Sequence, residues 1–245
     1  MKRNIKLTVT YDGSGFFGFQ LQPEVPTVQG TLEKVLQVVL GEKVRVAGSG
    51  RTDTGVHACR QVVAFETRCP IPVDKLLVCM NSRLPETLRI LTVQEVPEDF
   101  HPRFSAKGKH YRYVFRSGAE FSPFLARYCF QIPEKLDFEK MAAAAPVFTG
   151  KNDFAAFARS PDRYENTVRE VFTSEVEKSG DFIFFDVSGS GFLHNMVRNM
   201  AKAFYLIGKG EMQPFEIDEL YQNRDRTRLG NPAPAGGLYL MKVMY

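Results

Sequence analysis

The order of hydrophobic periods along the chain constrains its fold more than any other feature. Alternating apolar and polar residues, typical of half-buried strands, occupy 4–11, 43–49, 60–66 and 87–96. Apolar residues at helical spacing occupy 28–40 and 73–83. The predicted order is therefore βαββαβ, the order of a ferredoxin-like unit.

The same order of elements is predicted a second time after the segment EDFHPRFSAKG. The second set has strands at 109–117, 167–178, 181–190 and 237–244 and helices at 137–149 and 192–207. This repeat predicts an α+β fold of two ferredoxin-like halves, 1–104 and 105–245. A cleft between two such halves is the expected place for a ligand.

Composition and charge exclude several classes of protein. Lys and Arg outnumber Asp and Glu by 32 to 28, a net charge of +4 that permits a polyanionic partner without requiring one. The basic N-terminus MKRNIKLTVT lacks the apolar segment of a signal peptide, and no apolar run approaches the roughly 18 residues of a membrane span. We therefore expect a cytoplasmic protein that does not cross a membrane.

The four cysteines show neither a CxxC pair nor the spacing of a zinc site. They are predicted to be reduced structural thiols, and no metal is expected. The four are Cys59, Cys69, Cys79 and Cys129.

A glycine-rich turn, GSGRTDTGVHA at 48–58, follows the strand-like run EKVRVA. It is not a P-loop, because Val56 and His57 stand where that motif has Lys and Ser or Thr. It is not a dinucleotide fingerprint, because Asp53 stands where the third glycine belongs. With a single acid it also lacks the ligands of an EF-hand.

What remains is a turn whose glycines let the backbone approach a bulky ligand closely. Arg51 and Asp53, two positions apart, are then expected to face one target. The alternative is that Asp53 caps the turn through its own backbone, as aspartates in loops commonly do.

The turn resembles the signature SGRTD-x-GVHA of the tRNA pseudouridine synthase A family. Further segments resemble that family in the same order over about 230 residues: YDGSGFFGFQ, TVQGTLEKVL, NSRLP, FHPRFSAKGKHYRY, FTGKNDFAAF, GFLHNMVRNM and APAGGLYL. Two positions depart from the usual pattern, Phe19 in place of tryptophan and Thr54 in place of alanine. Neither is a group that the chemistry requires.

The resemblance implies the pseudouridine synthase fold, with a central and mostly antiparallel sheet. It also implies an isomerase that detaches uracil from C1′ of a tRNA uridine, turns the base and rejoins it through C5. The implied targets are positions 38 to 40 of the anticodon stem-loop, and the implied assembly is a homodimer. Because atoms are only rearranged, no cofactor is expected.

Four site residues follow from the resemblance. Asp53 matches the nucleophile, and Arg51 matches the residue that braces the stack when the base leaves it. Tyr111 matches the ring that stacks on the flipped uracil and can move a proton, although a strand tyrosine is more often part of a core. Arg198 matches the arginine that keeps Asp53 ionised, although it also fits a solvated helix face.

The residues around these positions follow ordinary secondary-structure patterns. In the strand 109–117, Tyr111, Tyr113 and Phe115 share one face, and His110, Arg112 and Val114 share the other. In the helix, a core stripe is predicted at Leu193, Met196, Val197, Met200 and Phe204. His57 is expected to satisfy its ring nitrogens within the turn and to take no part in catalysis.

Eight further cations are candidate phosphate contacts: Lys107, Lys109, Arg112, Arg116, Arg159, Arg163, Lys202 and Lys209. A second function remains open, a non-catalytic RNA-binding protein with two RRM-like halves that stack bases on strand aromatics. Loss of Asp53 would abolish activity in the enzyme and leave the binding protein unaffected. A zinc nucleobase deaminase is disfavoured, because the H-x-E and P-C-x-x-C elements are missing.

Overall fold

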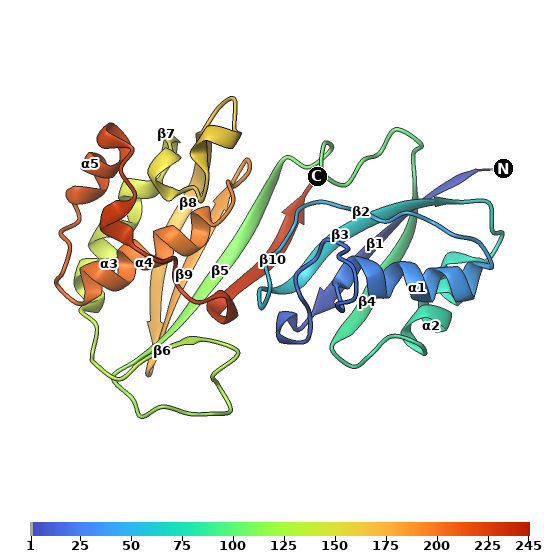
Figure 1. Ribbon diagram of the computed structural model, residues 1–245, viewed down its shortest axis with the longest axis horizontal. Coiled ribbons are helices and arrows are strands. Elements are labelled where there is room, and N and C mark those ends of the chain that lie inside the picture. The colour runs from blue at the N-terminus through green and yellow to red at the C-terminus, as the bar shows by residue number, and fades with distance from the viewer. Residues whose placement is uncertain (1) are drawn as a thin grey trace. The chain divides into compact units, whose positions relative to one another are not determined.

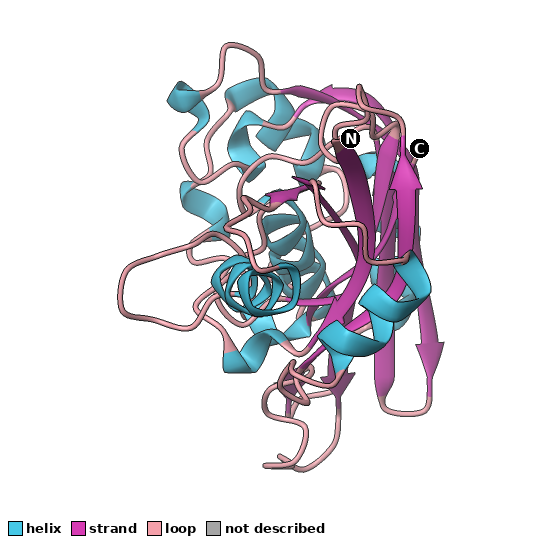
Figure 2. Cartoon of the chain, turned by 90° about the vertical axis from the view of Figure 1, so that its right-hand side faces the viewer, coloured by secondary structure: helices cyan, strands magenta, loops and turns pink. Residues whose placement is uncertain are grey.

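The computed structural model describes residues 2–245 and divides them into two compact units. Unit 1 runs to Lys107 and also includes Tyr239–Tyr245, and unit 2 is Gly108–Leu238. Figure 1 labels their elements, and Figure 2 colours helices and strands separately and shows the twist of the strands. In each unit the sheet is mostly antiparallel, so the fold is α+β, as the sequence predicts.

Unit 1 has the predicted βαββαβ order. Its elements are β1 (Arg3–Tyr11), α1 (Val28–Leu40), β2 (Ala47–Gly48), β3 (His57–Thr67), α2 (Val73–Asn81), β4 (Leu88–Val96) and β10 (Leu238–Met244). Strand β1 lies between β3 and β4 and is antiparallel to both. β2 pairs with Val63 and Ala64 of β3, and β10 runs parallel to β3 at His57 and Ala58.

The two faces of the unit 1 sheet differ in burial. In β1, Ile5, Leu7 and Val9 are fully buried, whereas the alternate side chains from Lys6 to Thr10 are half-exposed. Helices α1 and α2 contact each other, and α2 contacts β4. We infer that both helices cover the Leu7 face, and we name the opposite face, which carries Lys6 and Thr8, the reverse face.

Helix α1 begins and ends where its sequence predicts. The Thr27 hydroxyl accepts a hydrogen bond from the Gly30 amide at 3.2 Å, which caps the first turn. Gly41 ends the helix in the left-handed conformation, with φ of 72°. Val28, Leu32 and Leu36, spaced by four residues, are all fully buried.

Unit 2 also combines strands with helices. Its elements are β5 (Gly108–Ser117), β6 (Phe130–Ile132), α3 (Phe138–Ala144), β7 (Gly150–Asp153), β8 (Val168–Ser179), β9 (Phe182–Gly189), α4 (Met196–Gly208) and α5 (Glu216–Asn223). Antiparallel pairing places β9 between β5 and β8, and β7 lies on the far edge of β8. β6 runs parallel to β5.

The core of unit 2 is aromatic. Phe204 of α4 contacts Phe148 and Phe185, with ring centroids 5.3 and 4.6 Å apart. The predicted core stripe is confirmed, because all five side chains are buried, four of them on α4 and Leu193 just before it. On β5, Tyr111, Tyr113 and Phe115 are buried on one face, as predicted.

Short helical turns complete the secondary structure. Single-turn 3-10 helices occur at Gly13–Gly15, Ala145–Phe148, Ala155–Phe157, Pro161–Arg163, Thr227–Leu229 and Ala235–Gly237. No helix in the part of the chain that the structure describes combines the length and the apolar content of a membrane span.

The strand predicted at 43–49 is wrong in extent, because only Ala47 and Gly48 pair with β3. Two side chains of α1 hydrogen-bond to the backbone of Val46 instead. Its amide donates to Glu33 Oε1 at 3.0 Å, and its carbonyl accepts from Gln29 Nε2 at 3.1 Å. Side chains of a helix therefore satisfy the backbone hydrogen bonds that a neighbouring strand was expected to satisfy.

Helix boundaries differ from the predictions in unit 2. The helix predicted at 192–207 begins only at Met196, because Asn195 is left-handed with φ of 62°. The helix predicted at 137–149 is α-helical only to Ala144 and continues as a 3-10 turn containing Pro146. Strands β6 and β7 and helix α5 were not predicted.

The last strand differs from the predicted repeat. It was expected to belong to the half 105–245, but Tyr239–Tyr245 belongs to unit 1, where β10 pairs with the start of β3. Pairing between segments so far apart in the chain leaves no signal in the local periodicity of either.

Candidate active site

The glycine-rich turn lies in unit 1 and connects β2 to β3. The Val56 amide donates to the Asp53 carbonyl at 3.1 Å and closes a tight turn. Gly55 within that turn is left-handed, with φ of 80°. The main-chain carbonyl of Asp53 is thus used in shaping the turn, and its side chain is half-exposed.

Residues of this loop are anchored alternately. The Gly50 carbonyl accepts from Gln61 Nε2 at 3.0 Å, and the Thr52 carbonyl accepts from the Phe19 amide at 3.0 Å. Between and beyond these anchors, Arg51 is exposed and Asp53 half-exposed. Arg51 and Asp53 are therefore accessible residues on either side of the buried, anchored Thr52.

Two glycines of the loop before α1 let that loop pack closely against the turn that carries Asp53. A Cβ on Gly18 would lie 2.9 Å from the Thr52 carbonyl oxygen, and Gly18 is left-handed with φ of 84°. A Cβ on Gly13 would lie 2.0 Å from the Val56 carbonyl oxygen. Any side chain at either position would displace the turn that carries Asp53.

A buried polar network below the loop was not predicted from the sequence. The Tyr11 and Thr52 hydroxyls are hydrogen-bonded at 2.8 Å, and burial raises the pKa of Tyr11 to about 12 against the opposing effect of that bond. Gln61 Oε1 accepts from the Ser49 hydroxyl and from the Val62 amide. The available signal was a glutamine on the apolar face of a strand, which needs buried partners.

His57 is a buried histidine at the end of the turn. Its ring stacks on Tyr239 with centroids 4.7 Å apart, and its Nδ1 accepts a hydrogen bond from the Gly13 amide at 3.1 Å. Asp12 Oδ1 lies 3.2 Å from the same nitrogen. Because Nδ1 cannot accept from Gly13 and also donate to Asp12, we take the backbone contact as the hydrogen bond.

Tyr111 lies on β5 in unit 2 and is 9% exposed. Its ring packs edge-to-face on Phe192, with centroids 5.2 Å apart and the planes at 82°. Two residues along the strand, the Tyr113 hydroxyl donates to the Pro234 carbonyl at 2.8 Å. A small part of the Tyr111 side chain is therefore exposed, whereas Tyr113 is fully buried in the core.

Arg198 lies in the first turn of α4 and is half-buried. Its Nε donates to the Ala233 carbonyl at 2.8 Å, and a terminal nitrogen donates to Asn195 Oδ1 at 3.3 Å. Burial raises the pKa of Tyr113 well above its usual range, and the charge of Arg198 acts against that shift. The hydrogen bonds to Ala233 and Asn195 thus orient this guanidinium, unlike that of an arginine on a solvated helix face.

Several of the candidate phosphate contacts already have protein partners. Arg112 Nε donates to both carboxylate oxygens of Asp186 at 3.0 Å, and His110 Nε2 lies 2.8 Å from Oδ1. Burial opposes the ionisation of Asp186, but these hydrogen bonds outweigh it and lower its pKa. Arg116 pairs with Asp181 at 3.7 Å, and Lys209 with Glu211 at 2.8 Å.

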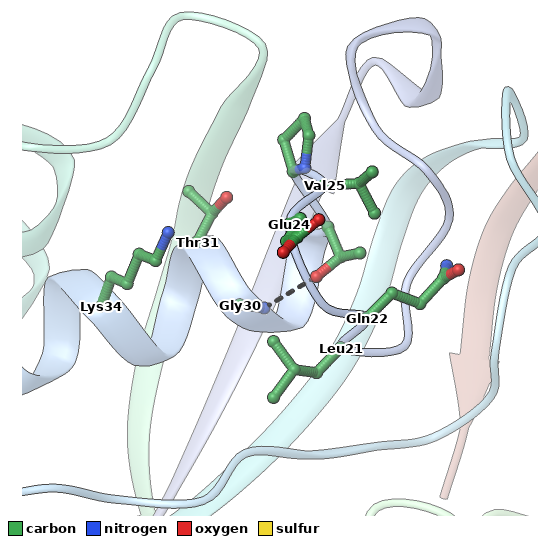
Figure 3. A pocket seen from close by; sticks show the side chains of 9 residues that line it. Leu21, Gln22, Glu24, Val25, Gly30, Thr31 and Lys34 are labelled. Carbon is green, nitrogen blue, oxygen red and sulfur yellow. Dashed lines mark hydrogen bonds between the residues drawn. The ribbon is translucent and has the colours of Figure 1, made fainter.

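A surface hollow of about 470 Å³ lies beside the start of α1. Figure 3 shows its lining, including Leu21, Glu24, Val25 and Lys34, together with the capping bond to the Gly30 amide. None of the four predicted site residues lines it. Among residues 2–245, no group of three or more His, Cys, Asp and Glu is arranged to hold a metal ion.

Comparison with known proteins identifies the family. The model of the tRNA pseudouridine synthase family matches residues 7–105 and 144–245. The proteins named tRNA pseudouridine synthase A from Thermoanaerobacter sp. (strain X514) and Ruminiclostridium cellulolyticum are 39% and 41% identical, each over 99% of this chain and 100% of the relative. That from Geobacillus kaustophilus is 42% identical over 100% of this chain and 95% of the relative.

The chain belongs to the tRNA pseudouridine synthase family. It is accordingly an isomerase that acts on tRNA, and the alternative of a non-catalytic RNA-binding protein is not favoured. Within this family the glycine-rich loop, with Arg51 and Asp53, falls inside the first matched segment, and Arg198 falls inside the second. Tyr111 lies between the two segments, in a part of the chain that the relatives above also cover.

Proposed function

We propose that this tRNA pseudouridine synthase modifies uridines at positions 38 to 40 of the anticodon stem-loop, with Asp53 as nucleophile. In the net reaction the bond from C1′ to N1 breaks and a bond from C1′ to C5 forms. C5 loses its proton and N1 gains one, so no redox partner is consumed. A carboxylate that acts covalently divides this difficult exchange into two easier steps.

The observation that carries the proposal is the alternate anchoring of the Asp53 loop. Gly50 and Thr52 are held by Gln61, Phe19 and Tyr11, so the backbone on both sides of Arg51 is fixed before substrate arrives. A carboxylate on a fixed loop acts without first being ordered. Three steps are open to its ionised oxygen: attack on the base, attack on the ribose, or removal of a ribose proton.

Arg51 is proposed to brace the RNA when the uridine leaves its stack. Its exposed position next to Asp53 supports this role. A planar guanidinium can both stack on a neighbouring base and contact phosphate.

Tyr111 is proposed to stack on the extruded uracil and to move a proton through its hydroxyl. Its remaining exposure and the edge-to-face packing on Phe192 support this role, because they leave the ring rigid and partly accessible.

Arg198 is proposed to keep the nucleophile ionised. The hydrogen bonds to Ala233 and Asn195 hold its guanidinium in a fixed orientation, which supports this role.

The homodimer implied by the family resemblance also remains a prediction, which sedimentation equilibrium of the purified protein will test.

The decisive experiment replaces Asp53 with asparagine, which has nearly the same shape. We expect normal folding and normal or slightly tighter tRNA binding, because one negative charge near phosphate is removed. The single-turnover rate should fall by at least about 10⁴, the scale seen when a nucleophile is removed. Pseudouridine is mapped by nucleotide position, so the same assay tests whether 38 to 40 are the targets.

Asp162→Asn is the matched control, because Asp162 is an exposed aspartate of unit 2. It should retain full activity. A folded Asp53→Asn protein that still forms pseudouridine at an appreciable rate would return Asp53 to the role of a turn cap.

A further inference from the structure

The reverse face of the unit 1 sheet contains a small hollow that the proposed reaction does not use. Its volume is about 140 Å³. The hollow is lined by Lys6, Thr8, Arg60, Val62, Lys242, Val243 and Tyr245. Three of these side chains are cations, contributed by β1, β3 and β10, and none of the lining residues is acidic.

The strand register separates this hollow from the Asp53 loop. Thr8 pairs with Val62 and Lys6 with Ala64, so these side chains share the reverse face. Tyr11, whose hydroxyl contacts the loop at Thr52, continues the opposite face together with Leu7 and Val9. The two sites therefore lie on different faces of one sheet.

Lys6 is held at the edge of the hollow by two aromatic rings. Its Nζ lies 5.7 Å from the centroid of Phe100 and 5.8 Å from that of Tyr245. The Tyr245 hydroxyl donates to the Pro102 carbonyl at 2.8 Å, and Asn4 Nδ2 donates to the carbonyls of Pro97 and Phe100. These bonds fix the 97–102 segment on the sheet, so the position of the ammonium group is set in advance.

Three like charges around one small hollow repel each other, and an anion bound between them offsets that repulsion by attraction to each. A phosphate oxygen suits the site, because Arg60 offers a planar fork of donors, the two lysines offer compact charges, and Thr8 offers a hydroxyl. The substrate of this enzyme family is tRNA, which carries one backbone phosphate group per nucleotide.

We propose that this hollow binds a backbone phosphate of tRNA that lies outside the arm carrying the target uridine. The hollow lies on the face of the sheet opposite to the Asp53 loop, where that uridine would react. We therefore assign the hollow to a phosphate from a different arm of the tRNA. The proposal rests on the proposed function, with tRNA as substrate and its anticodon arm as target, and is independent of the identity of the nucleophile.

The test is the triple variant Lys6→Gln, Arg60→Gln, Lys242→Gln. Equilibrium binding is measured for full-length tRNA and for an isolated anticodon stem-loop over a series of salt concentrations. For full-length tRNA we expect Kd to rise about tenfold or more and the slope of log K against log salt to fall by about 1. Stem-loop binding and the single-turnover rate at saturating tRNA should remain within about twofold.

The charge-matched control is Lys135→Gln, Lys151→Gln, Lys178→Gln, three exposed lysines of unit 2. If this control weakens tRNA binding as much, net charge alone is responsible and the proposal is overturned. Equal weakening of tRNA and stem-loop binding, or no change in either, also overturns it. So does a change in sedimentation mass with unchanged RNA affinity, which would make the reverse face an interface between two copies of the chain.

If the triple variant is not folded by circular dichroism, Lys242→Gln alone replaces it, since Lys242 is exposed. The expected rise in the Kd of full-length tRNA is then about threefold, and an unchanged Kd overturns the proposal. Failure of Asp53 as nucleophile would appear in the chemical step and not in these binding measurements, so the two proposals fail separately.

Discussion

Replacing Tyr11 with phenylalanine tests whether the buried network beneath the Asp53 loop contributes to catalysis. The substitution keeps the ring in the core and removes the hydroxyl that lies 2.8 Å from that of Thr52. Both residues are less than 10% exposed, so water does not readily replace the lost partner. Thr52, adjacent to Asp53, is then left with a buried hydroxyl that lacks this hydrogen bond.

The size of the effect follows from that burial. Leaving a buried polar group without its partner costs about 1–3 kcal/mol. If the whole cost falls on the conformation of the loop that is competent for reaction, the single-turnover rate drops between about fivefold and about 150-fold. The affinity for tRNA should change by less than about twofold, because Tyr11 is buried beneath the loop.

The assay combines rates with a double-mutant cycle. Single-turnover rates are measured for Tyr11→Phe, Thr52→Val and the double variant, and the two effects should be non-additive by about 0.5–3 kcal/mol. At saturating tRNA, Tyr245→Phe is the control, because it removes a hydroxyl bonded at 2.8 Å to Pro102 in the same unit. It should alter stability without altering the rate.

The raised pKa of Tyr11 gives a second readout. A phenol whose pKa is higher in the folded state holds its proton when the unfolded chain has lost it. The stability from this group is therefore complete below about pH 10 and is lost as pH rises toward the folded value of about 12. Tyr11→Phe should lose less stability than the wild type over this interval in urea titrations.

A clear result would refute the reasoning. If Tyr11→Phe unfolds at lower urea but keeps its single-turnover rate within twofold, and if the cycle with Thr52→Val is additive, the network serves the fold alone.

Four further substitutions give the remaining predictions. Arg198→Met keeps most of the side-chain length but removes the charge, and turnover should fall by roughly 10² or more with the fold intact; near-normal turnover would return Arg198 to a structural role on α4. Gly18→Ala introduces left-handed strain of about 1–2 kcal/mol and a Cβ 2.9 Å from the Thr52 carbonyl, so activity should fall. Gly41→Ala carries similar strain with no atom within 4 Å of its Cβ, and should lower the melting temperature while sparing activity. Asp186→Asn should lower the free energy of unfolding by about 1–3 kcal/mol at pH 7. Because the pKa of Asp186 is lowered in the folded protein, that difference should shrink as pH falls below about 4 in urea titrations, and a difference independent of pH would contradict the role of its charge.

The sequence by itself determined the local structure wherever the signal lies within one turn or one strand. The alternation in β1 and β5, the Thr27 cap, the Gly41 stop and the apolar stripe of α4 are set by neighbouring residues, and each was predictable. The motif around Asp53 likewise indicated the family, since its residues are contiguous. The roles of the four site residues remain predictions.

Only the tertiary structure decided the features that depend on partners distant in the chain. Val46 gives its backbone groups to Gln29 and Glu33 of α1, which shortens a predicted strand to two residues. The last strand joins β3, about 180 residues earlier in the sequence. The local pattern of such a segment is the same whichever partner satisfies its hydrogen bonds, so periodicity cannot identify that partner.

The anchoring of the Asp53 loop belongs to this second class. Tyr11 and Thr52 are 41 residues apart, and the sequence around each reads as an ordinary strand end and an ordinary turn. Their hydroxyls hold the loop in place because folding buries both side by side. Away from water, a hydrogen bond between the two hydroxyls replaces the bonds that each would make to solvent. Burial is a property of the packed chain, and it turns a glycine-rich turn in the sequence into a fixed loop.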